Sequence, residues 1–99
     1  MTTFLEKQGI ELKDPSTCDV LTTLEELDEP GTPYVNIRLH DEEGWSLEVY
    51  ESGAVEFYNG NPKKRLCRKN VPHEEIVQMW RMMQDGNREG IKKTMMQGK

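Results

Sequence analysis

Apolar and polar residues alternate along the middle of the chain with the period of two that a half-buried strand requires. The alternation covers 35–39, 45–50 and 55–58, and glycine-containing turn sequences separate the three segments. The pattern predicts an antiparallel meander of three strands. Its apolar side chains are expected to face one way, toward the helices: Val35, Ile37, Leu39, Trp45, Leu47, Val49, Val55 and Phe57.

Before the meander, apolar residues recur at helical spacing instead. Within 15–27 they fall at i, i+4 and i+7, and Asp14 and Pro15 supply a helix cap and a first helical residue. We therefore predict a helix over 15–27. The β-branched Thr22 and Thr23 leave a strand over the same residues as the alternative.

Two further helices are expected in the C-terminal third of the chain. Asn70 is expected to cap the first, Pro72 lies in its first turn, and the turn sequence at 85–87 ends it. The second is expected over 88–96. Five methionines in these helices are interpreted mainly as core residues, with an adaptable binding surface as the alternative: Met79, Met82, Met83, Met95 and Met96.

Two segments complete the predicted sheet. Residues 3–12 are expected to form one short strand, and the basic segment 63–69 a fourth strand of the meander at the sheet edge, where lysines discourage unwanted pairing. The whole chain, 1–99, is expected to be a single α+β domain. Its antiparallel sheet should have four to five strands, with one face covered by two to three helices.

Charge is divided unevenly along the chain. Positions 1–62 hold fourteen acidic residues and three basic ones, a net charge of −11, whereas 63–99 hold ten basic and four acidic residues, a net charge of +6. An electrostatic field divided in this way steers charged partners toward the protein and disfavours partners of unsuitable charge. Plain solubility is the alternative explanation of the acidic surplus.

Several classes of protein are disfavoured. No apolar run is long enough for a membrane span and no secretory signal is visible, so a cytoplasmic location is the default. Cys18 and Cys67 lack metal-ligand spacing and are expected to be reduced, partly buried thiols. His40 and His73 belong to no recognisable catalytic triad, and no glycine-rich phosphate loop is present. We expect neither enzyme activity nor a cofactor or metal site.

Nucleic acid is a minor alternative as a partner. Phosphates attract the clustered lysines and arginines of 63–69. The chain as a whole is acidic, however, with a net charge of −5, and the basic segment lacks the interleaved aromatic residues of a stacking platform.

The alternation of the meander also predicts a candidate binding surface. On the side facing away from the helices it places two tyrosines among charged residues: Arg38, Glu48, Tyr50, Glu56 and Tyr58. The acidic loop after the first strand of the meander is expected to extend this surface as a rim: Asp41, Glu42 and Glu43. Rigid amphipathic anchors with a negative potential suit a basic protein partner. An ordinary solvated sheet face with cross-strand tyrosine pairs is the alternative.

The order of segments carries a family resemblance. The chain has a capped helix ending at 24–28, a strand segment at 33–37, a hairpin over 46–57 and a helix containing Val77 to Trp80. This layout resembles that of small bacterial immunity proteins of polymorphic or contact-dependent toxin systems. The resemblance implies a non-enzymatic inhibitor of a cognate toxin, many of which are basic nucleases. The alternative is a small regulatory or structural adaptor that self-associates through an edge strand or the methionine-rich helices.

Overall fold

The computed structural model describes residues 1–32, 35–60 and 65–97. It contains these elements: β1 (Thr3–Lys7), β2 (Ile10–Lys13), α1 (Thr17–Asp28), β3 (Asn36–Asp41), β4 (Trp45–Tyr50), β5 (Val55–Asn59), β6 (Leu66–Arg68), α2 (His73–Gln84) and α3 (Arg88–Met96). Lys63 and Lys64, which were expected to begin the last strand, lie outside the described residues.

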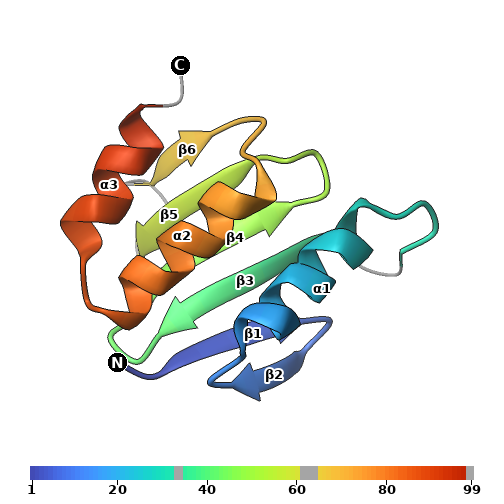
Figure 1. Cartoon of the computed structure of the whole chain (residues 1–99), viewed down its shortest axis with the longest axis horizontal. Coiled ribbons are helices and arrows are strands. Elements are labelled where there is room, and N and C mark those ends of the chain that lie inside the picture. The colour runs from blue at the N-terminus through green and yellow to red at the C-terminus, as the bar shows by residue number, and fades with distance from the viewer. Residues whose placement is uncertain (33–34, 61–64, 98–99) are drawn as a thin grey trace.

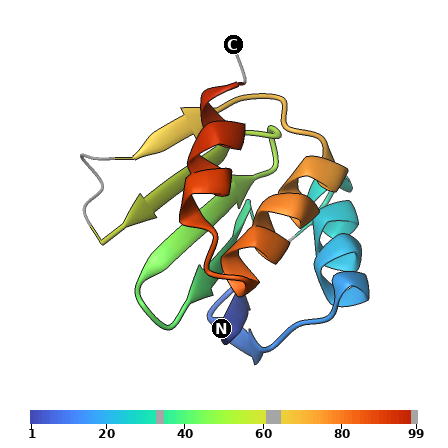
Figure 2. The ribbon, with the colours of Figure 1, turned by 60° about the vertical axis from the view of Figure 1, so that its left-hand side comes forward.

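The strands form one sheet in the order β2-β1-β3-β4-β5-β6, and every neighbouring pair is antiparallel (Figure 1). All three helices lie on one side of this sheet, as Figure 2 shows, and the other side is left uncovered. The predicted α+β class is therefore confirmed. The sheet has six strands rather than the expected four to five.

The additional strand comes from the N-terminus, where 3–12 was expected to form a single strand. The chain instead reverses at Gln8 and Gly9, whose φ angles are 49° and 77°. Two consecutive left-handed residues are what a two-residue type I′ hairpin turn requires. The familiar sequence signal for this turn is Asn-Gly or Asp-Gly, so a glutamine in the first position hides it.

The first helix is confirmed over the alternative strand, but its cap differs from the expectation. Ser16 is the cap: its hydroxyl accepts the Asp19 N–H at 3.0 Å, and the Asp19 carboxylate accepts the Ser16 N–H at 2.9 Å. This reciprocal capping box satisfies two amides at once. Asp14 instead has a φ of 51° and donates its N–H to the Thr3 carbonyl, so it ends the β1–β2 hairpin.

The two C-terminal helices are present as expected, with one change at a helix start. α2 begins after Pro72 with no side-chain cap, while Asn70 lies in the preceding loop with a φ of 56°. Gly86, with a φ of 73°, follows the last turn of α2. α3 has the expected bounds, and the Asn87 side chain caps it by accepting the Gly90 N–H at 3.0 Å.

The core lies between the three helices and the sheet. Its largest fully buried side chains come from both layers: Phe57, Leu24, Leu27, Ile37, Leu39, Leu47, Ile76, Met79, Met83, Ile91, Val20 and Val49. The core interpretation is confirmed for Met79, Met83 and Met95, whereas Met96 is exposed. Val35 was expected to face the helices and is 60% exposed, because β3 begins only after it. Both cysteines are free and exposed rather than partly buried.

Candidate functional site

The uncovered side of the sheet, called here the open face, carries one continuous row of polar side chains. Strand register places the members of this row directly beside one another, one per strand: Glu11, Glu6, Arg38, Glu48, Glu56 and Cys67. Tyr50 and Tyr58 flank the row on β4 and β5. The structure therefore brings together five of the residues predicted from the strand alternation.

Glu48 lies in the middle of this row. Its carboxylate accepts hydrogen bonds from Asn36 Nδ2 at 2.9 Å, from the Tyr50 hydroxyl at 2.9 Å and from the Tyr58 hydroxyl at 2.6 Å. All three donors are neutral, and Glu48 forms no ion pair with any residue in the described part of the chain. The carboxylate is thus fixed in position, and none of the described arginines and lysines forms an ion pair with it.

Glu56, its neighbour on β5, is held differently. Arg65 Nη1 lies 2.6 Å from Glu56 Oε1, and the Tyr50 hydroxyl, whose single proton the carboxylates of Glu48 and Glu56 share, lies 2.7 Å from the same oxygen. The hydrogen bond from Arg65 is the main cause that holds the pKa of Glu56 below its usual value, although burial opposes it. The Arg65 guanidinium also lies over the Tyr58 ring, 5.5 Å from its centroid.

The two tyrosines act as fixed donors. Burial, and then hydrogen bonding to the carboxylates, raises the pKa of Tyr50 and of Tyr58 above the usual phenol value. Both phenols therefore keep their protons through the neutral range. A hydrogen bond that donates to an ionised carboxylate is stronger than a neutral one, so the tyrosine and carboxylate side chains hold each other in place.

The lowered pKa of Glu56 predicts a loss of stability in acid. A carboxyl whose pKa is lower in the folded state contributes stability above its unfolded pKa, and this contribution disappears as the pH falls through the folded pKa. The wild type should lose more unfolding free energy than Glu56→Gln between about pH 5 and about pH 3. Urea denaturation at each pH measures this, with Glu74→Gln as the control for losing one negative charge. Equal losses in the wild type and Glu56→Gln would contradict the stabilising role of the Glu56 carboxylate.

The acidic loop at 41–43 does not extend the open face as a rim. The Asp41 side chain is only 1% exposed and points to the helix side, where its Oδ1 accepts the N–H groups of Glu43 at 2.8 Å and Trp45 at 3.1 Å. Glu43 forms an ion pair with Arg88 of α3, and Glu42 accepts the Thr2 N–H at 3.0 Å. The expectation that Asp41 is an exposed contact residue is therefore wrong, since the turn buries it as a backbone acceptor.

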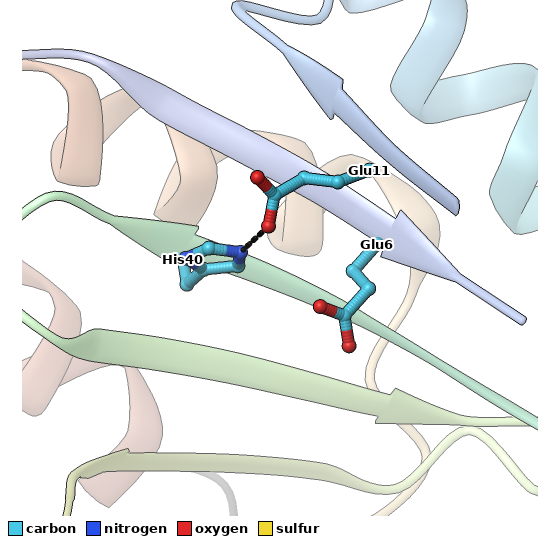
Figure 3. Close-up of side chains that lie close together, drawn as sticks. All are labelled: Glu6, Glu11 and His40. Atoms are coloured by element: carbon cyan, nitrogen blue, oxygen red, sulfur yellow. Dashed lines mark hydrogen bonds and ion pairs between the residues drawn. The ribbon is translucent and has the colours of Figure 1, made fainter. Parts of the chain in front are cut away.

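One cluster on the open face was not foreseen from the sequence. Glu6, Glu11 and His40 come from β1, β2 and β3, and one ligand atom of each lies within 4.8 Å of the others. Figure 3 shows the His40 ring directed at Glu11, at 3.1 Å from Nε2 to Oε2, with Glu6 beside them. Only the unexpected β1–β2 hairpin brings Glu11 to this position.

The cluster offers the nitrogen and oxygen donors that divalent transition ions accept. Arg38 Nη2, however, lies 2.9 Å from Glu6 Oε2 and already compensates that carboxylate. The same guanidinium would repel an incoming cation. We therefore assign no metal to Glu6, Glu11 and His40.

The known proteins give no further guide to the function of this site. In the part of the chain that the structure describes, no helix has the length and apolar character needed to cross a bilayer. The chemistry of the open face is thus the main basis for assigning a role. No protein-family model, curated protein or solved structure matches this chain.

Proposed function

We propose that this protein is a non-catalytic inhibitor, of the immunity or antitoxin kind, that binds a basic protein partner through the open face. The observation that carries the proposal is the state of Glu48. Three neutral donors fix this anion at the centre of the sheet and leave its charge unpaired among the described residues. A partner's arginine or lysine would supply the missing positive charge.

Arg65 provides an internal example of such a contact. Its guanidinium donates to Glu56 and lies over the ring of Tyr58. A partner's arginine could bind Glu48 in the same manner, with a charge-assisted hydrogen bond and a cation–π contact. Because the carboxylate and the rings are already held by hydrogen bonds, little side-chain entropy would be lost on binding.

The distribution of charge supports a basic partner. The helix α1, which is acidic in sequence, and the helix α3, which is basic, lie at opposite ends of the molecule in Figure 1. Such a field orients a charged partner during approach and raises the association rate. The segment order shared with small bacterial immunity proteins is consistent with a basic toxin as that partner.

The protonation behaviour of the site also favours binding over catalysis. A general acid or base works best with a pKa near the working pH. Here the pKa of Glu56 is lowered and those of Tyr50 and Tyr58 are raised, so each moves away from neutrality. A surface with constant charge suits a permanent docking site.

Glu48→Gln tests the proposal, because it removes the unpaired charge and keeps the shape of the side chain. The protein encoded beside this chain's gene is the partner to purify and titrate by calorimetry. We expect the dissociation constant to rise about tenfold or more, equivalent to about 1.4 kcal/mol. Raising the salt concentration should weaken binding of the wild type more than binding of Glu48→Gln.

Glu74→Gln is the matched control, since it removes one exposed carboxylate from the first turn of α2, on the covered side of the sheet. Its affinity should equal that of the wild type, and thermal unfolding should show that both variants are folded. An unchanged dissociation constant in Glu48→Gln, together with a wild-type dissociation constant that does not depend on salt concentration, would overturn the proposal. Failure of the neighbouring gene product to bind at all would also contradict the inhibitor role.

A role as a self-associating adaptor is the second candidate. The methionine-rich helices give it little support, since Met79, Met83 and Met95 are core residues, Met82 is partly buried against the core and Met96 is the exposed member of the set. The edge of the sheet at β2 supports it, because among the described strands β2 pairs with β1 alone.

A further inference from the structure

β2 is an edge strand with unusual exposure. All four of its residues are exposed, including two large apolar ones, Ile10 at 65% and Leu12 at 43%. A groove of about 250 Å³ separates β2 from α1, and Leu12 and Cys18 contribute to its walls. An exposed edge strand with apolar side chains is a template for pairing with another strand.

The hairpin geometry determines which backbone groups of β2 face outward. A two-residue loop makes the flanking pair, Lys7 and Ile10, a hydrogen-bonded pair, and bonded pairs then alternate along the hairpin. The Asp14 N–H donates to the Thr3 carbonyl at 2.8 Å, which agrees with this alternation. Ile10 and Leu12 therefore direct their amides at β1. Glu11 and Lys13 direct their N–H and C=O groups away from the sheet.

We propose that two copies of this chain associate by antiparallel pairing of β2 with β2, about a twofold axis at Leu12. In this register Leu12 lies opposite Leu12 of the second copy, and Glu11 lies opposite Lys13 of the second copy. Each Glu11–Lys13 pair exchanges both of its outward backbone hydrogen bonds, as an antiparallel bonded pair does. The Leu12 side chains meet on the helix side, beside the groove.

Charge selects this register over the neighbouring one. Glu11 and Lys13 are opposite in charge, and cross-strand pairs of opposite charge stabilise a sheet. An axis at Glu11 would also match the backbone groups, but it would place Glu11 against Glu11 of the second copy. Like charges directly opposite each other destabilise a sheet, so the axis at Leu12 is preferred.

Charge also distinguishes β2 from the other edge of the sheet. Arg65, Arg68 and Lys69 lie in or beside β6, so pairing of β6 with itself would bring positive charges together. Pairing of β2 with β2 is isologous and closes at the dimer, whereas pairing of β2 with β6 would continue as a filament. The short strands bury little area, so the dimer should form transiently at high concentration.

Amide hydrogen exchange tests the proposed edge at individual residues. From about 10 µM to about 1 mM protein, the amides of Glu11 and Lys13 should become protected as the dimer forms, because they acquire acceptors in the second copy. The Leu12 amide should be protected at every concentration, because it already donates to β1. Concentration-independent exchange at Glu11 and Lys13 would overturn the proposal.

A charge exchange tests the register. In sedimentation equilibrium, Lys13→Glu and Glu11→Lys should each raise the dimer dissociation constant about tenfold, since each puts like charges opposite one another. The double variant should return to within about threefold of the wild type. Lys93→Glu, on the exposed side of α3, is the control and should leave the constant unchanged.

A monomer at every concentration would overturn the proposal, as would a dimer whose dissociation constant is the same in the wild type and in both single variants.

This inference goes beyond the proposed function, because it uses the edge of the sheet rather than Glu48. Lys13→Glu leaves the Glu48 cluster intact. If Lys13→Glu weakens self-association and leaves the affinity for the protein partner unchanged, the substitution acts on the dimer alone. If Glu48→Gln weakens partner binding and leaves self-association unchanged, that substitution acts on the open face alone.

Discussion

Replacing Phe57 with alanine is expected to lower the free energy of unfolding by about 3–5 kcal/mol. Phe57 is 1% exposed and is the largest of the fully buried side chains. Its ring stacks on Trp45 with centroids 5.0 Å apart, and its strand neighbours are Leu47 and Leu66. Because a small domain is stable by only about 5–15 kcal/mol in total, this one change should remove much of the stability. Urea denaturation measures the effect.

Tyr58→Phe is the matched control for this experiment. Tyr58 is the next residue along β5 and points to the open face, where its hydroxyl donates to Glu48 at 2.6 Å. Removing the hydroxyl should cost about 1–2 kcal/mol and create no cavity. A Phe57→Ala variant no less stable than Tyr58→Phe would show that Phe57 does not support the core as described.

Strict alternation is the reason that the central part of the fold could be predicted. β3 and β5 alternate between one buried face and one more exposed face, and β4 does so from Leu47 onward. Parity alone therefore separates Phe57 from its neighbours Glu56 and Tyr58. The same parity placed Arg38, Glu48 and Tyr50 together on the open face. Parity does not reveal hydrogen bonds, however. Only the folded structure shows that, among the described residues, the donors to Glu48 are neutral whereas Glu56 accepts from Arg65.

The N-terminal hairpin could not be predicted in the same way. Whether 3–12 continues as one strand or reverses depends on Gln8 adopting a left-handed conformation that its side chain does not favour. That local reversal creates the edge at β2 and brings Glu11 to His40, two consequences that no short-range pattern contains. The burial of Asp41 also involves a contact distant in sequence, because Asp41 pairs with Thr3 of β1.

Asp41→Ala is expected to lower the free energy of unfolding by about 2–4 kcal/mol. The Asp41 carboxylate accepts the N–H groups of Glu43 and Trp45, so removing it leaves two amides of the β3–β4 turn without their acceptor. Its Oδ2 also lies 3.6 Å from Arg88 Nη2. Arg88 keeps its ion pair with Glu43, which limits the loss. Thermal and urea unfolding measure the change.

Two comparisons separate this structural role of Asp41 from a role in binding. Asp41→Asn keeps an acceptor and should cost less than Asp41→Ala, while Glu42→Ala changes an exposed side chain of the same loop and should cost about 1 kcal/mol or less. At a temperature where Asp41→Ala is fully folded, its affinity for the protein partner should match the wild type. If Asp41→Ala were as stable as the wild type but bound the protein partner more weakly, Asp41 would instead be a contact residue. The rim first expected from the sequence would then have to form by opening the turn that now buries this side chain.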